Sequence, residues 1–133
     1  MSVKAEAKGV RMSPRKVSVV ASLVRGRTVA DALTILEHTP RRAAIPVTKV
    51  IQSARANADY NHKYKPDSLV ITEISVTPGA RFKRYRPAAH GRALPYQLRS
   101  CHIRVLVDGD QRTPKKPATK SDADKADKKE ETK

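Results

Sequence analysis

The chain has 133 residues with 28 Lys and Arg against 13 Asp and Glu, so its formal net charge is +15, while aromatic residues make up only 4% of it. This length suits one domain, and the charge favours a polyanionic partner over the alternative of a protein that is merely basic. A single cysteine excludes an internal disulfide, and without a secretory or membrane-spanning apolar run we expect a cytoplasmic protein with no membrane contact.

The first third of the chain is predicted to form a strand and two helices. Residues 3–11 alternate small or apolar with polar side chains, as an edge strand does. Ser13 and Pro14 then start one helix, and Thr28 starts a second, short one through a capping-box pattern with Asp31. Their inward faces are expected to be Val17, Val20, Ala21 and Val24, ending at Gly26, and then Val29, Ala32, Leu33 and Leu36.

A third and longer helix is predicted over residues 40–60, because Thr39 and Pro40 repeat the cap-and-proline pattern. Pro46 is awkward inside a helix since it removes a backbone donor, so either the helix kinks there or its regular part begins at Ile45. The buried stripe is expected to consist of Val47, Val50, Ile51, Ala54 and Ala58.

Two further strands are separated in the sequence but matched in pattern. Residues 68–77 are expected to place Val70, Ile74 and Val76 on one face, and residues 101–107 to place Cys101, Ile103, Val105 and Val107 on one face. The segment between them, residues 78–100, is long for a structureless loop in a compact domain. We therefore predict an α+β fold of three helices packed on a small antiparallel sheet, with one long protruding β-hairpin.

This hairpin carries the functional prediction, because no acidic residue occurs from Ile74 through Val107. Seven basic residues do occur there: Arg81, Lys83, Arg84, Arg86, Arg92, Arg99 and Arg104. Their repulsion calls for an external counter-charge, and an isolated two-stranded ribbon needs a surface to lie against. Arginine suits phosphate, so we expect a structured polyanion as the partner; the alternative is a disordered basic loop.

Glycines mark the two ends of the predicted arm. Gly91 is expected to take a positive φ in a turn near residues 89–92, with Pro87 and Pro95 limiting edge pairing beside it. Gly79 is expected to allow a bend or bulge where the arm leaves the body.

A change of composition near Gln111 sets the domain boundary. Residues 1–110 are predicted to form one RNA-binding domain that includes the arm at about residues 78–100, and residues 111–133 a disordered charged tail. The tail holds 8 of the basic and 5 of the acidic residues, which leaves the domain a net charge of +12.

Three segments resemble the bacterial form of the large-subunit ribosomal protein L-twenty-two family. They are VRMSPRKVSVVASLVRGRTVADAL at residues 10–33, IQSARANADYNH at 51–62, and TPGARFKRYRPAAHGRA followed by SCHIRVLV within 77–107. The resemblance covers about residues 4–108. It implies a structural constituent of the large ribosomal subunit, not an enzyme, that binds 23S rRNA, supports subunit assembly and lines the nascent-peptide exit tunnel with its hairpin, without metal or cofactor.

The resemblance also implies roles for individual residues. The expected rRNA-binding residues are Arg11, Arg15, Lys16, Arg25, Arg27, Arg81, Lys83, Arg84, Arg86, Arg92, Arg99 and Arg104, and the hairpin tip comprises Pro87, Ala88, Ala89, His90, Gly91 and Arg92. The expected partners are 23S rRNA, neighbouring large-subunit proteins including ribosomal protein L-four at the tunnel constriction, and the nascent peptide, with macrolide antibiotics lodging near the tip. Ala88 and His90 stand where basic residues are frequent in the family.

Two other classes of protein share features with this sequence. An architectural DNA-binding protein also uses long basic β-arms with proline near the tip, although such proteins are usually dimers with a substantial apolar interface. An enzyme finds little support, because His38, His62, His90 and His102 with Cys101 lack zinc-ligand spacing and no phosphate loop or Ser-His-Asp pattern occurs. Cys101 is interpreted as a small core residue.

Overall fold

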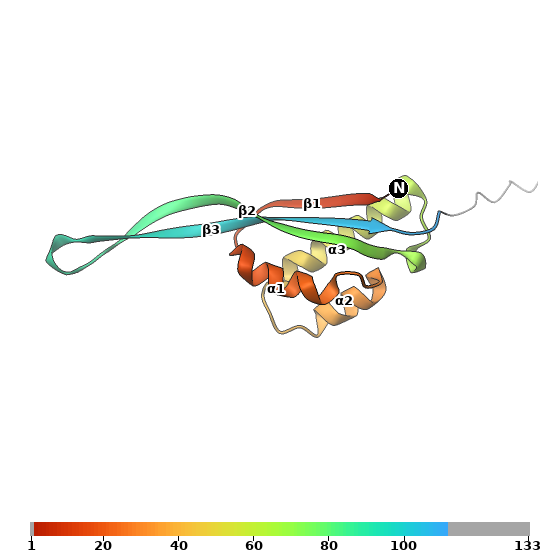
Figure 1. Cartoon of the computed structure of the whole chain (residues 1–133), viewed down its shortest axis with the longest axis horizontal. Coiled ribbons are helices and arrows are strands. Elements are labelled where there is room, and N and C mark those ends of the chain that lie inside the picture. The colour runs from red at the N-terminus through yellow and green to blue at the C-terminus, as the bar shows by residue number, and fades with distance from the viewer. Residues whose placement is uncertain (1, 112–133) are drawn as a thin grey trace, which may run out of the picture.

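The computed structural model describes residues 2–111, which form three α-helices and a three-stranded sheet. In chain order the elements are β1 (Val3–Val10), α1 (Pro14–Val24), α2 (Val29–Glu37), α3 (Ala44–His62), a 3-10 turn (Pro66–Ser68), β2 (Val70–Pro87), a second 3-10 turn (Ala89–Gly91) and β3 (Ala93–Asp108). The strand order is β1-β3-β2, with both pairs antiparallel. The helices lie on one side of the sheet, and β2 and β3 run far beyond them as an arm (Figure 1). The predicted α+β fold with one long hairpin is confirmed.

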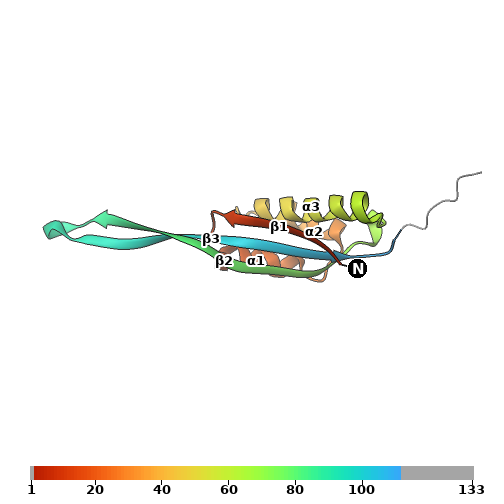
Figure 2. The same ribbon diagram turned by 90° about the horizontal axis from the view of Figure 1, so that it is seen from above.

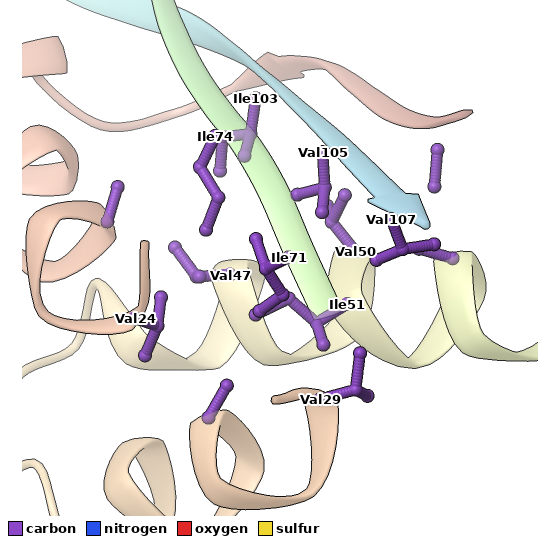
Figure 3. Packing of buried hydrophobic residues seen from close by; sticks show 14 of the residues in the cluster. Val24, Val29, Val47, Val50, Ile51, Ile71, Ile74, Ile103, Val105 and Val107 are labelled. Atoms are coloured by element: carbon purple, nitrogen blue, oxygen red, sulfur yellow. The ribbon is translucent and has the colours of Figure 1, made fainter. Parts of the chain in front are cut away.

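The core of the body lies between the inner face of the sheet and the helices (Figures 2 and 3). The predicted inner face of β3 is confirmed, since Cys101, Ile103, Val105 and Val107 are all fully buried. The helix stripes are confirmed too: Val17, Val20, Ala21, Val24, Val29, Ala32, Leu36, Val47, Val50, Ile51, Ala54 and Ala58 are buried, and Leu33 is partly buried. Because these side chains are small, the body gains only a modest free energy from their burial.

The first two helices begin and end where their local chemistry predicts. Ser13 is the N-cap of α1 with Pro14 in the first turn, and the Thr28 hydroxyl accepts a hydrogen bond from the Asp31 N–H at 3.2 Å. Gly26 follows α1 with a φ of +74°, a conformation that favours glycine. Its N–H donates to the carbonyl of Ile71, so the turn between α1 and α2 is tied to the edge of the sheet.

The predicted start of the third helix is wrong. α3 begins at Ala44 rather than at Pro40, which agrees with the alternative that its regular part begins near Ile45. Pro46 therefore lies in the first turn, where a backbone N–H would have no helical partner. The proline that looked disruptive is thus tolerated, and no kink is needed to explain it.

The predicted inner face of β2 is wrong at one position. Val70 is 40% exposed, whereas Ile71 and Ile74 are buried although they are three residues apart. A register shift between Ile71 and Glu73 inserts Thr72 as an extra residue, and this bulge turns both isoleucines toward the helices. Val76 packs against the core as a partly buried side chain, as predicted.

The arm leaves the body where three strands become two. β1 ends its pairing at Val10, which lies opposite Cys101, so β3 pairs beyond that point only with β2. Register shifts occur at this level on both neighbours of β3, between Ala7 and Val10 and between Pro78 and Arg81. Figure 2 shows the two strands of the arm twisting about each other beyond this neck.

The bulge expected at Gly79 is confirmed, and the reason for glycine is a close approach rather than a positive φ. A Cβ on Gly79 would lie 2.7 Å from the Ser100 Oγ and 3.2 Å from the His102 ring. Moving the Ser100 hydroxyl away would break the 2.6 Å hydrogen bond that it donates to the Ala80 carbonyl. On the other side of β3, His102 Nδ1 accepts a hydrogen bond from the Gly9 N–H. The neck is therefore a defined junction of three strands.

Beyond β3, Gln111 forms an isolated bridge with Tyr64, and the Lys65 N–H donates to the Asp110 carbonyl. The predicted tail begins at Gln111, which the structure describes; the rest of it, residues 112–133, lies outside the described residues.

Candidate nucleic-acid interface

The two strands of the arm present two chemically different faces, because directly opposed residues in an antiparallel pair point to the same side. The basic face carries the pairs Arg81–Arg99, Lys83–Gln97 and Tyr85–Pro95. The mixed face carries Phe82–Leu98, Arg84–Tyr96 and Arg86–Leu94. Side chains alternate between the two faces along β3, so Pro95, Gln97 and Arg99 lie on the same side as the buried residues from Cys101 to Val107. The basic face of the arm therefore continues the inner face that the helices cover in the body. The strand thus changes from aliphatic to cationic where the helices end.

The mixed face combines exposed rings with guanidinium groups. Phe82 is 58% exposed and Leu94 57%. The Arg86 guanidinium lies over the Tyr96 ring, 5.1 Å from its centroid. Aromatic faces stack on nucleobases of any sequence, and arginine adds phosphate donors and cation–π contacts beside them. This face is suited to irregular RNA with unstacked bases.

The predicted tip is a tight turn closed by its own backbone. The Ala88 N–H donates to the Arg92 carbonyl at 2.8 Å, and the Arg92 Nε donates back to the Ala89 carbonyl at 3.4 Å. Gly91 has a φ of +68°, as predicted, but His90 also lies in the left-handed region with a φ of +59°. The same conformation at a histidine was not predicted, because only glycine adopts it without steric cost. The arm is an ordered hairpin in the structure, so the alternative of a disordered basic loop is wrong.

Body residues predicted to bind rRNA differ in whether their side chains also make contacts within the protein. Arg15 and Lys16 are exposed in the first turn of α1, and Arg27 is exposed after its end. Arg25 is also exposed, but its Nη2 donates a 3.0 Å hydrogen bond to the Ile74 carbonyl of β2. Arg25 therefore holds α1 to the sheet as well as presenting charge to solvent.

Arg104 differs from the arm arginines because it faces a carboxylate of its own chain. It lies opposite Glu6 in the register of β1 and β3, on the outer face of the sheet. The Lys4 ammonium, 3.1 Å from the Glu6 carboxylate, holds the pKa of Glu6 below its ordinary value against the opposing effect of desolvation, and Lys8 and Arg104 act in the same direction as Lys4. Part of the charge of Arg104 is thus balanced within the body.

The interpretation of Cys101 as a core residue is confirmed. Its side chain is fully buried, and burial raises the pKa of the thiol. Among residues 2–111, no group of three or more His, Cys, Asp or Glu side chains could hold a metal ion. Within the same residues, no helix is both long and apolar enough to cross a membrane.

Comparison with known proteins decides the family. Residues 5–108 match the family described as ribosomal protein L22p/L17e. The chain belongs to that family. It is similar to the large ribosomal subunit protein uL22 of Oceanobacillus iheyensis, with 50% identity over 107 residues that cover 80% of this chain and 95% of the relative. The same protein of Desulfitobacterium hafniense is 51% identical over 104 residues (78% and 91%), and that of Herpetosiphon aurantiacus 48% over 108 residues (81% and 96%).

Membership of the L22p/L17e family confirms the resemblance noted in the sequence, and it makes the chain a structural ribosomal protein and not an enzyme. The matched residues include both the body and the whole arm. The rival hypothesis of an architectural DNA-binding protein finds no support in these relatives, all of which are named as ribosomal.

Sequence reasoning missed the division of the arm into two faces. The alternation was present in the sequence, but the phase between the strands depends on the turn that joins them. Once Pro87 is set opposite Ala93, every pair back to Arg81 and Arg99 follows. A turn assigned as residues 88–92 would have supplied the faces from the sequence alone.

Proposed function

We propose that this chain is a structural protein of the large ribosomal subunit that binds 23S rRNA, supports subunit assembly and lines the nascent-peptide exit tunnel with its arm. The observation that carries the proposal is the arm itself. It is a two-stranded ribbon with no acidic residue from Ile74 through Val107, and its guanidinium groups and rings are exposed. Such a ribbon buries too little to be stable alone, and rRNA supplies both its counter-charge and its packing surface.

Residues 1–110 act in this proposal as one rRNA-binding domain, and the arm is an extension of its sheet rather than a second domain. The strongest support is the continuity of β2 and β3, which run from the core to the tip without a linker. The rRNA-binding residues are those expected from the sequence, with two distinctions. The arm residues carry unbalanced charge, whereas Arg25 and Arg104 also serve contacts within the body.

The tip, residues 87–92, is the part of the arm that meets the tunnel lumen in this proposal. Ribosomal protein L-four is its neighbour at the constriction, the nascent peptide passes it, and macrolide antibiotics lodge close to it. The turn is held by three hydrogen bonds between Ala88, Ala89 and Arg92, so it offers a compact wall element rather than a loose loop.

Salt-dependent binding to protein-free 23S rRNA tests the proposal. Each phosphate neutralised contributes roughly 0.7–0.9 to the slope of log affinity against log salt. The variant Lys83→Gln, Arg84→Gln, Arg86→Gln should therefore lower the slope by roughly 2–3. A control that removes equal charge from exposed body positions, Lys49→Gln, Arg55→Gln, Lys65→Gln, should change the slope much less. A wild-type affinity that is flat with salt would contradict the proposal.

A further inference from the structure

A cleft lies at the shoulder of the molecule, where the arm joins the helical layer. It has a volume of about 650 Å³ and lies between the loop before α1, the start of α3 and the base of β3. Its lining residues are Arg11, Met12, Ser13, Lys16, Arg41, Arg42, Ala43, Gln97, Leu98 and Arg99. Figure 1 shows α1 beginning beneath the point where β2 and β3 leave the body. This volume is within the range of about 300–1,000 Å³ that is typical of small-molecule pockets.

Five cations converge on this shoulder cleft from three separate parts of the chain. Arg11 and Lys16 flank the start of α1, Arg41 and Arg42 precede α3, and Arg99 comes from the basic face of the arm. All five are exposed, and none of the described residues that line the cleft is acidic. Like charges that meet without a counter-ion repel, so this arrangement favours an anionic occupant.

The start of α1 adds to the same field. α1 has 11 residues, and its N-cap Ser13, which makes no side-chain cap hydrogen bond, lines the cleft. Pro14 has no N–H and the Lys16 N–H already donates to the Ser13 carbonyl, so α1 contributes chiefly the positive end of its dipole, which attracts phosphate. Here that attraction adds to the five side-chain charges.

The rest of the lining is apolar. Met12 is partly buried there, and Ala43 is buried. A site for a phosphate alone does not require such a surface, and a duplex backbone cannot offer a base to it. A nucleotide turned out of a single-stranded loop or bulge fits both the cationic and the apolar part of the cleft. Its phosphates would lie on the cations and its base against the apolar side chains.

We propose that the shoulder cleft binds one nucleotide turned out of the rRNA, and that Arg41 and Arg42 belong to the RNA-binding surface. The proposal rests on the proposed function and adds two residues to the binding set expected from the sequence. It makes the shoulder a second anchoring point, distinct from the arm, that fixes the direction in which the arm leaves the body.

Binding of the full chain to protein-free 23S rRNA, measured across salt, tests this proposal with a matched pair of variants. Arg41→Gln with Arg42→Gln should raise the dissociation constant roughly 10-fold for each lost charge-assisted contact. It should also lower the salt slope by about 1.4, at about 0.7 per single-strand phosphate. The control Arg55→Gln with Lys65→Gln removes the same charge and should leave both quantities close to wild type.

A third variant separates the base contact from the phosphate contacts. Met12→Gln should weaken binding several-fold without changing the salt slope, because it removes an apolar contact and no charge. Acylation of ribose 2′-hydroxyls should show one loop or bulge nucleotide that the wild type and the control protect and the Arg41, Arg42 variant does not.

The outcomes separate this proposal from the one on which it rests. If the arginine pair behaves like its control, in affinity, slope and footprint, while the Lys83, Arg84, Arg86 variant still weakens binding, the cleft proposal is wrong and the proposed function stands. That result would also be expected if the cleft received an acidic protein segment instead of RNA. If the wild type shows no salt-dependent binding, the proposed function itself fails.

Discussion

Strands β2 and β3 differ in how their side chains are packed in the body and in the arm. In the body, every second residue of β3 from Cys101 to Val107 is fully buried under the helices. In the arm, the large apolar side chains Phe82, Tyr85, Leu94 and Tyr96 are exposed, with Tyr85 at 73%. The body therefore completes its core with its own helices, whereas the arm has no helix or second sheet from the described residues packed against its strands. The difference indicates that the arm needs an outside surface to complete its packing, which rRNA supplies in the proposed function.

The largest expected effect is on the body core. Ile103→Ala, which empties a fully buried site in the core, should lower the free energy of unfolding by about 2–5 kcal/mol. Leu94→Ala, the matched aliphatic truncation on the arm, should change it by less than about 0.5 kcal/mol. Urea unfolding of the free proteins measures both. Equal losses would mean that the arm packs on a core in the absence of RNA.

A smaller effect is expected at the neck, where body and arm meet. Gly79→Ala would push the Ser100 hydroxyl out of its hydrogen bond with the Ala80 carbonyl, at a cost of about 1 kcal/mol in unfolding free energy. Ser100→Ala should cost a similar amount. The double variant should lose less than the sum, since both changes break the same bond. Full additivity would contradict a shared contact.

Shortening the arm should leave the body almost unchanged. Lys83 to Arg86 pair with Leu94 to Gln97 in register, so deleting both quartets removes four complete pairs and keeps all other pairs intact. The expected change in the unfolding free energy of the body is within about 0.5 kcal/mol. On the ribosome, the same deletion should alter tunnel geometry and the response to macrolides. Loss of the circular dichroism of the folded body would disprove a modular arm.

The smallest effect is expected on the outer face of the body. Because the folded pKa of Glu6 lies below its ordinary value, its carboxylate stabilises the fold above that ordinary pKa, and the contribution disappears as the pH falls through the folded pKa. Glu6→Gln should therefore destabilise the protein slightly at neutral pH and not at a pH well below the ordinary carboxyl value of about 4.3. Urea titrations at the two pH values measure this, and added salt should reduce the difference. A larger loss of unfolding free energy on Glu6→Gln at low pH than at neutral pH would contradict this prediction.

Much of the fold follows from local patterns that the sequence displays openly. The stripes of α1 and α3 and the alternation of β3 needed no tertiary information, because burial on one side of a regular element fixes its period. The errors lie where a neighbour decides. Thr72 forms a bulge because Ile71 and Ile74 must both reach the helices. The late start of α3 at Ala44 is a local effect, since Pro46 is tolerated in a first turn, and the sequence offered it as one of two alternatives.

The candidate interface divides in the same way. An acid-free basic ribbon could be located by counting charges, and its members were named from the sequence. Arg41 and Arg42 were not, since nothing within their own segment distinguishes them from other surface arginines. Their place in the shoulder cleft depends on the docking of α3 against the base of β3, more than fifty residues away in the chain.

The sequence by itself determined which segments form helices and strands, which face of most of them is buried, and that a basic hairpin had to find its counter-charge elsewhere. These properties depend on the spacing and the sum of residues within one segment. Only the tertiary structure decided the register of the arm, the close approach at Gly79 and the meeting of five cations at the shoulder, because each of these depends on side chains brought together from distant parts of the chain.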